Sequence, residues 1–303
     1  MKTLRSSFMI RSDLFIVAFL FMSANITHAV IPNVSAQTNA AMLAAPSSST
    51  NSKVPNIPAA GSGGLEIKKD VKYFDNASGY LVYPSANFSN TTSATKKLPA
   101  VIMIHEFWGI NDNIRSMANT LATQAGYVVL AVDLFKGQST NDPNRASQLV
   151  QSVRANPQEA ISNLQAAVKY VSSLPFVNSS KIASIGWCFG GGQSLQLALH
   201  SEQHPLLATI LYYGTPLVTD KQELSKIKWP VLGIFGDHDR ANPLPLINMF
   251  KSALDGAGVT NQVVIYKGLG HAFANPSGPN YAPQQTVDAW QKTLAFLKKY
   301  LEV

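Results

Sequence analysis

The sequence predicts an α/β fold in which a mostly parallel central sheet of about eight strands is covered by helices on both faces. Two observations predict it. From Leu65 onward, short apolar segments alternate with segments of helical periodicity, the pattern of βαβ units. The segment 99–106 and others like it are apolar along almost their whole length, as expected of strands buried on both sides.

The strands and helices follow one another in chain order. The first two predicted strands form an antiparallel edge pair. The predicted strands are 66–74, 79–85, 99–106, 127–133, 181–187, 207–213, 230–236 and 261–267. The predicted helices are 111–126, 146–172 with an interruption near Asn156 and Pro157, 191–200, 244–254 and a C-terminal helix with the apolar stripe Val287, Trp290, Leu294 and Leu297.

The helix over 111–126 shows how these boundaries are inferred. Ile114, Met117 and Leu121 recur on one helical face, so that face is expected to pack on the sheet. Asn111 precedes them as an N-cap, and Gly126 follows as a C-terminal stop.

Composition divides the chain into three regions. Residues 1–29 have the features of a secretory signal peptide, residues 30–64 form a flexible low-complexity linker, and residues 65–303 form the α/β domain. The linker is rich in Ser, Asn, Ala and Pro and has too little apolar surface to fold alone. We therefore expect a secreted or extracytoplasmic protein.

The signal peptide is inferred from a basic start and an apolar stretch. Lys2, Arg5 and Arg11 precede the apolar segment Leu14–Met22, and the small residue Ala29 suits cleavage. The apolar segment is much shorter than the roughly 20 residues that span a bilayer. The alternative is that this segment is retained as an N-terminal anchor, and we expect membrane association only in that case.

Charge and cysteine content exclude other classes. The formal net charge is +7, but the basic residues are scattered and form no run interleaved with aromatic residues. Nucleic-acid binding normally needs a basic patch, so it is not expected. The chain contains one cysteine, which excludes an intramolecular disulfide.

That cysteine, Cys188, lies in the sequence G-W-C-F-G between a predicted strand and a predicted helix. G-x-C-x-G at such a junction is the nucleophile-elbow pattern with cysteine in place of serine. The flanking Gly186 and Gly190 avoid collisions between the neighbouring strand and helix. The helix beginning at Phe189 favours a thiolate through its positive end. The alternative is an inert buried cysteine.

A histidine and an aspartate follow the last two predicted strands. His271 is the candidate base, and Asp239 is the candidate acid that orients it. The chain order Cys188, Asp239, His271 is that of the α/β-hydrolase fold. Asp237 is the rival acid, although Asp237 and His238 are also suited to capping a turn.

The segment H-E-F-W-G ends the first long apolar strand. In this fold the loop at that point and the residue after the nucleophile supply the oxyanion-hole N–H groups, which here are those of Phe107 and Phe189. Glu106 is expected to be buried, which is costly without a task or a partner. The alternative to a catalytic task is a structural salt bridge, for example with an arginine.

Together the segments HEFWG, GWCFGG, GDHD and GHAF resemble those of the dienelactone hydrolases, cysteine-dependent members of the α/β-hydrolase superfamily. The resemblance covers residues 65–303. It implies a Cys188–His271–Asp239 triad that hydrolyses small lactones or esters through a thioester, with no metal and no cofactor. It also implies that Glu106 contacts the resting thiol and takes its proton when substrate arrives.

The resemblance fails at one position. The family binds a substrate carboxylate with two arginines, one of them four residues after the catalytic histidine, where this chain has Asn275. Arg145 is the candidate for the second arginine, and its alternative is a solvated helix residue. An amide cannot reproduce a bidentate arginine, so we expect a neutral or differently shaped ester. The aromatic residues expected to line the pocket, unless they belong to the core, are Phe107, Trp108, Trp187 and Phe273.

Three functional hypotheses follow. The first is an exported hydrolase of small carboxylic esters or lactones. The second is a non-catalytic binding protein on the same fold, which the intact triad argues against. The third is an acyltransferase, because the same thioester serves acceptors other than water.

Overall fold

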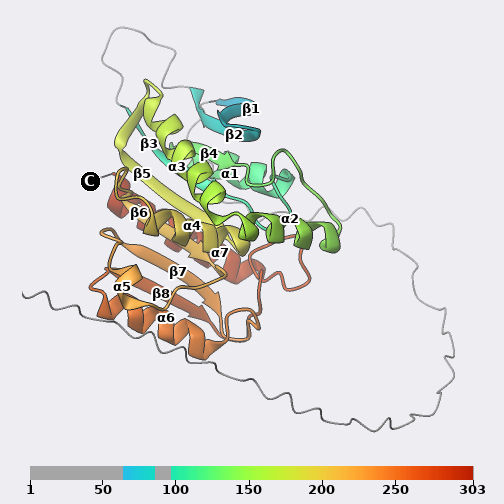
Figure 1. The fold of residues 1–303 in the computed structure, drawn as a ribbon, viewed down its shortest axis with the longest axis vertical. Helices are drawn as coiled ribbons and strands as arrows, with labels where there is room; N and C mark the ends of the chain where they lie inside the picture. Colours follow the sequence, from blue (N-terminus) through green and yellow to red (C-terminus); the bar gives the residue numbers. More distant parts are fainter. Residues whose placement is uncertain (1–63, 86–96, 303) are drawn as a thin grey trace, which may run out of the picture. The chain divides into compact units, whose positions relative to one another are not determined.

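The computed structural model describes residues 64–85 and 97–302 (Figure 1). The predicted signal peptide, 1–29, and the predicted linker, 30–64, lie outside the described residues except for Gly64. Among the helices of the described ranges, none combines the length and the apolar character required to cross a bilayer.

The described residues form one eight-stranded sheet with helices between the strands. The strands are β1 (Leu65–Phe74), β2 (Ala77–Pro84), β3 (Leu98–Ile104), β4 (Val128–Val132), β5 (Val177–Trp187), β6 (Ala208–Tyr212), β7 (Val231–Gly236) and β8 (Asn261–Tyr266). The helices are α1 (Asp112–Ala125), α2 (Pro143–Ala155), α3 (Pro157–Ser173), α4 (Phe189–Leu199), α5 (Lys221–Leu224), α6 (Leu244–Gly256) and α7 (Pro283–Leu301).

The strand order across the sheet is β1-β2-β4-β3-β5-β6-β7-β8 (Figure 1). β1 pairs antiparallel with β2, and β2 pairs antiparallel with β4. All other neighbouring strands are parallel. The predicted fold class, including the antiparallel edge pair, is confirmed.

Local sequence signals explain the ends of α1. The side chain of Asn111 accepts a hydrogen bond from the backbone N–H of Ile114 at 3.1 Å, which satisfies one free donor of the first turn. Gly126 ends the helix with φ 71° and donates to the carbonyl of Ala122. Both signals are the ones that the sequence predicts.

Two apolar layers cover the sheet. Buried residues of α1 and α7 pack on one face, and buried residues of α2, α3, α4 and α6 pack on the other. Alternate residues of β3 and β4 enter opposite layers, as the alternation of side chains along a strand requires. The central strands are therefore buried on both sides, which fits their near-continuous apolar sequence.

The start of β5 and the short helix α5 differ from the sequence prediction, whereas the break in the long helical region agrees with it. β5 begins at Val177, because Val177 pairs with Leu98 beside a register irregularity. The interruption predicted near Asn156 and Pro157 is present, since Pro157 starts α3 immediately after Asn156 ends α2. α5 is a single capped turn that has no apolar periodicity to reveal it.

Candidate active site

The candidate nucleophile lies on a strained turn between β5 and α4. Cys188 has φ 55° and ψ −120°, a conformation that costs a non-glycine residue about 1–3 kcal/mol. The backbone holds it there: the N–H of Cys188 donates to the carbonyl of Tyr212 at 3.0 Å, and its own carbonyl accepts from Thr215 at 3.1 Å and Gly192 at 3.2 Å. The turn exposes the side chain at the carboxyl edge of the sheet, where parallel α/β sheets carry their sites.

Two glycines allow the turn to form. A Cβ on Gly186 would lie 2.1 Å from the carbonyl oxygen of Gly190. A Cβ on Gly190 would lie 2.3 Å from the oxygen of Ile104 and 2.4 Å from that of His105. The spacing G-x-C-x-G is thus required by the close approach of β5, α4 and the end of β3.

The three residues of the predicted triad lie in hydrogen-bond contact. Nε2 of His271 is 3.0 Å from Sγ of Cys188, and Nδ1 is 2.8 Å from Oδ2 of Asp239. Cys188 and His271 are partly buried, whereas Asp239 is 2% exposed. The side chains come from the ends of β5, β7 and β8.

The structure separates the two candidate acids. Asp237 accepts a hydrogen bond from the N–H of Gly268 at 2.6 Å and lies 3.9 Å from the exposed His238, so it joins the loop after β7 to the loop after β8. Asp239 is the carboxylate that contacts His271.

The carboxylate of Asp239 is held on both oxygens. Oδ1 accepts from the backbone N–H of Ala241 at 2.8 Å and of Asn242 at 3.2 Å. Oδ2 accepts from the side-chain amide of Asn242 at 3.2 Å, and the same amide donates to the carbonyl of Tyr213. Asn242 is fully buried and was not singled out in the sequence, because nothing distinguishes it from an ordinary turn residue.

The surroundings favour a protonated histidine. Burial alone would lower the pKa of His271, but its hydrogen bonds to Asp239 and Cys188 raise that pKa to about 10. Burial would raise the pKa of Asp239, and the hydrogen bond and charge of His271 outweigh it, so that pKa is lowered. The arrangement can hold an imidazolium between a carboxylate and a sulfur atom.

Glu106 follows β3 and is 3% exposed. Its Oε2 accepts from the side-chain amide of Asn275 at 2.6 Å, and its Oε1 lies 3.4 Å from the hydroxyl of Tyr213. Within the described residues it forms no salt bridge, so the arginine partner that the sequence allowed is replaced by neutral donors. Burial raises the pKa of Glu106 to about 7, with the hydrogen bonds from Tyr213 and Asn275 and the charge of His271 opposing the rise.

This geometry differs from what the resemblance implies for Glu106. The sulfur of Cys188 contacts His271, whereas both oxygens of Glu106 face Asn275 and Tyr213. The short amide of Asn275 sits close enough to hold the carboxylate itself. Asn275 is 6% exposed and its amide is engaged, so it does not present a free group to a substrate.

The backbone N–H groups of Phe107 and Phe189, the two predicted oxyanion donors, make no hydrogen bond to another of the described residues. Phe189 is the first residue of α4, where backbone N–H groups lack an intrahelical partner. Phe107 lies in a short turn closed by the hydrogen bond from the N–H of Gly109 to the carbonyl of Glu106. Both N–H groups are therefore free to bind a developing negative charge.

A buried histidine supports this loop, and sequence reasoning missed it. Nε2 of His105 accepts from the N–H of Leu134 at 3.3 Å, so Nδ1 carries the proton and donates to the carbonyl of Glu106 at 2.6 Å. Burial lowers the pKa of His105, which keeps it neutral. Its ring packs on Phe135 and Phe189 with centroids 4.6 and 6.0 Å away.

The predicted pocket aromatics divide into two groups. Phe107 and Trp108 are partly buried beside the candidate oxyanion hole, and their ring centroids are 4.0 Å apart. Phe273 is fully buried against Tyr213 and Tyr266, so it belongs to the core, which is the alternative that the sequence left open.

Trp187 and Arg145 also lie elsewhere than expected. Trp187 is 2% exposed and packs on Tyr212, because a residue next to the nucleophile in a strand points to the other face of the sheet. Arg145 is exposed on the first turn of α2 and donates to Gln138 and Gln148. That position agrees with the solvated alternative.

Comparison with known proteins relates these features to a family. Residues 86–301 match the sequence model of the dienelactone hydrolase family. The chain is 31% identical over 211 residues to protein usf of Aquifex pyrophilus, covering 67% of this chain and 89% of that protein. It is 30% identical over 240 residues, covering 66% of this chain and 89% of the other, to a Saccharolobus solfataricus protein provisionally named carboxymethylenebutenolidase.

Solved structures agree at the level of the fold. A dienelactone hydrolase-like promiscuous phosphotriesterase from metagenomic libraries superposes with a TM-score of 0.69 at 24% identity, covering 78% of this chain and 99% of that one. The family match, 86–301, contains the elements from β3 to α7 and the three residues of the predicted triad. The chain therefore belongs to the dienelactone hydrolase family and is a hydrolase with an α/β-hydrolase fold.

Proposed function

We propose that this chain hydrolyses small carboxylic esters or lactones, with Cys188 as nucleophile and a thioester as the covalent intermediate. The observation that carries the proposal is the continuous row of contacts from Sγ of Cys188 through the ring of His271 to Asp239, at 3.0 and 2.8 Å. A nucleophile, a base and an orienting acid at these distances are the requirements of acyl transfer.

Acylation begins with the sulfur of Cys188. A pKa of about 10 for His271 favours imidazolium at neutral pH, and this cation and the positive end of α4 both face the sulfur of Cys188. The thiolate adds to the carbonyl carbon, and the oxygen, now negative, is bound by the N–H groups of Phe107 and Phe189. The C–O bond then breaks, and the leaving alkoxide takes the proton from His271.

Deacylation uses the same groups in reverse. Neutral His271 accepts a proton from water as the water oxygen adds to the thioester carbonyl. The C–S bond breaks, the thiolate and imidazolium are restored, and the product leaves as a carboxylic acid. For a lactone the acid and the alcohol remain on one molecule. Asp239 keeps the ring in the orientation that serves both steps.

The proposal is tested with short-chain aryl esters and small lactones. Purified full-length protein is expected to hydrolyse them, and Cys188→Ala is expected to lose nearly all turnover. Mass spectrometry after acid quenching is expected to find the acyl group on Cys188. Full turnover by Cys188→Ala would refute the cysteine mechanism. No turnover by either the unaltered protein or Cys188→Ala would refute hydrolysis of these esters.

The contact between Asn275 and Glu106 supports a neutral substrate. Where the family places an arginine, this chain has an amide already bonded to a buried carboxylate, so no cation meets a substrate carboxylate there. We expect kcat/KM to be higher for neutral esters than for matched esters that carry a carboxylate. Asn275→Arg is expected to shift that preference toward the charged ester by about tenfold. Equal rates on both esters in the unaltered protein would contradict the assignment.

A further inference from the structure

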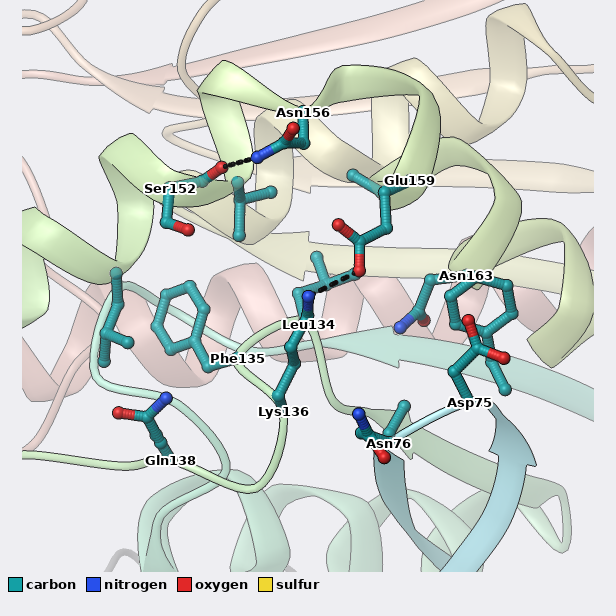
Figure 2. A pocket seen from close by; sticks show the side chains of 15 residues that line it. Asp75, Asn76, Leu134, Phe135, Lys136, Gln138, Ser152, Asn156, Glu159 and Asn163 are labelled. Atoms are coloured by element: carbon teal, nitrogen blue, oxygen red, sulfur yellow. Dashed lines mark hydrogen bonds and ion pairs between the residues drawn. The ribbon is translucent and has the colours of Figure 1, made fainter.

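A cavity of about 170 Å³ lies apart from the triad (Figure 2). The turn between β1 and β2, the connection from β4 to α2, and residues of α2 and α3 line it. Cys188, His271 and Asp239 are not among its lining residues. Its base is apolar, formed by Leu134, Phe135, Leu149 and Val153.

The rim is polar. Asp75 and Asn76 contribute a carboxylate and an amide from the β1–β2 turn, Gln138 contributes an amide from the β4–α2 connection, and Ser152 contributes a hydroxyl from α2. Figure 2 shows these side chains around the space, with Asn156 and Asn163 on the α3 side. Polar and charged side chains make up about half of the lining, so the cavity suits a ligand that offers both hydrogen-bonding groups and C–H surface.

An ion pair forms part of the lining. Nζ of Lys136 lies 2.7 Å from Oε1 of Glu159 (Figure 2), and the two side chains are 58% and 42% exposed. Exposed pairs of this kind contribute little to stability, so the pair can separate to admit a ligand. It also neutralises the one cation of the lining, and Asp75 leaves the lining with a net negative charge.

These groups select the chemistry of the occupant. A negatively charged lining with its lysine already paired disfavours carboxylates and phosphates. Amide and hydroxyl groups both donate and accept hydrogen bonds, as each hydroxyl of a polyol also does. A ring or short chain with several hydroxyl groups places them on the rim and its C–H surface on Leu134 and Phe135.

The base of the cavity also supports the candidate oxyanion hole. The ring of Phe135 lies 4.6 Å from that of His105 and 5.5 Å from that of Phe189, centroid to centroid. The N–H of Leu134 donates to Nε2 of His105. Two consecutive residues therefore face the cavity on one side and hold the loop of Phe107 and the start of α4 on the other.

We propose that this cavity is a second binding site for a small neutral polyhydroxylated ligand, and that its occupancy changes the rate at the triad through Leu134 and Phe135. Binding is independent of the function proposed above. Only the effect on rate rests on it.

Binding is tested on the full chain by titrating backbone amide NMR signals with myo-inositol, xylitol and glucose. At least one of them is expected to cause saturable shifts in the segments 74–77, 134–138 and 149–163. Ser152→Trp, at an exposed lining position, is expected to fill the space and abolish the shifts. Gln151→Trp is the matched control, since Gln151 is exposed on the same helix outside the lining, and it is expected to bind normally.

Each result decides between outcomes. Saturation by tetramethylammonium or butyrate in place of the polyols would overturn the ligand class, and saturation by none of them would overturn the site. The effect on rate is tested by ester turnover with and without the bound polyol. A change in kcat of about fivefold is expected in the unaltered protein and in Gln151→Trp, but not in Ser152→Trp. Binding without any change in kcat would overturn the coupling and leave the site.

Discussion

At the residue scale, burial sets the charge state of Glu106, and the hydrogen bonds of two neutral neighbours oppose its effect. An amide from Asn275 and a hydroxyl from Tyr213 face its oxygens, and burial raises its pKa to about 7. Burial also raises the pKa of Tyr213 well above the usual value, so its hydroxyl remains protonated and able to donate. A carboxyl that changes charge near neutral pH thus lies beside the histidine of the triad.

Glu106→Gln is expected to stabilise the protein at neutral pH and not at low pH. The folded pKa of Glu106 is about 7 and the reference value is 4.5, so the unfolded state loses its proton first. Stability therefore falls as pH rises from 4.5 to 7, and the cost is constant above that window. The glutamine avoids a cost of about 3 kcal/mol above pH 7.

Urea unfolding at pH 4, 6 and 8 measures this difference. Glu66→Gln, an exposed position on β1, is the control for removing a carboxylate anywhere on the chain. A difference between Glu106→Gln and the unaltered protein that stays constant across these pH values would contradict the burial argument.

Asn242→Ala tests how firmly Asp239 is held. The substitution removes the amide that bonds Oδ2 of Asp239 to the backbone of Tyr213. A less ordered carboxylate raises the pKa of His271 less, so the alkaline limb of the pH–kcat profile is expected to move to lower pH, with kcat lower by about tenfold. Asn144→Ala, on exposed helix surface, is expected to change neither.

A fall in kcat for Asn242→Ala with an unchanged pH profile would indicate general loss of structure, and it would contradict the positioning role. Ester turnover across pH, together with the thermal midpoint of each variant, separates the two cases.

The residues at strand ends were predictable, and their supporting partners were not. Cys188, Asp239 and His271 each follow a recognisable apolar strand, which places them at one edge of the sheet. The contact between Glu106 and Asn275 joins loops 169 residues apart, and no local pattern encodes it. The sequence left Phe273 undecided between pocket and core, because an aromatic residue close to a candidate catalytic residue carries the same sequence signal in both places.

At the element scale, the junction of β5 and α4 depends on the absence of side chains. α4 starts directly after the strained Cys188, and its first turn passes against the carbonyls that end β3. The lengths of β5 and α4 are tolerant by comparison: β5 starts earlier than its apolar pattern indicates without altering the elbow.

Gly190→Ala is expected to destabilise the fold by more than about 3 kcal/mol, because the new Cβ would lie 2.3 Å from a backbone oxygen that cannot move aside. Gly126→Ala is the matched control. It has φ 71° but open space around it, so only the left-handed backbone cost of about 1–2 kcal/mol is expected. Urea unfolding of both variants gives the comparison, and equal losses would show that backbone conformation rather than close packing decides the elbow.

The elements that the sequence predicted are those with a long pattern. The central strands β3 to β7 carry apolar runs, and α1 carries an apolar stripe with a cap at each end. α5 covers only Lys221–Leu224 and depends on the side chain of Asp220 as its cap, so no periodic signal precedes the structure. The β5 extension depends on pairing with Leu98, which is a tertiary contact.

At the scale of the whole molecule, the described domain has two apolar layers that share one sheet. Leu164 of α3 and Leu297 of α7 are fully buried in opposite layers. Neither layer has a sheet of its own, so neither is expected to persist when the other is lost.

Leu164→Ala and Leu297→Ala are each expected to cost about 2–5 kcal/mol and to leave a single unfolding transition. Trp229 lies in one layer and Trp290 in the other. The fluorescence of two variants, one that keeps only Trp229 and one that keeps only Trp290, therefore reports on the two layers separately. Coincident transitions by fluorescence and far-UV circular dichroism support one cooperative unit. Separate midpoints for the two layers would contradict it.

The three groups of the proposed triad are contributed by strand ends that are far apart along the chain. The thiol follows β5, the carboxylate follows β7 and the imidazole follows β8, which is the edge strand at the C-terminal side of the sheet. During synthesis the thiol is thus completed long before its imidazole exists, and a truncated or half-assembled chain carries an ordinary cysteine. If the proposed triad is correct, ester turnover in a cell extract measures the amount of completely folded protein. The rate at which turnover returns after dilution from denaturant then includes the step in which β8 pairs with β7.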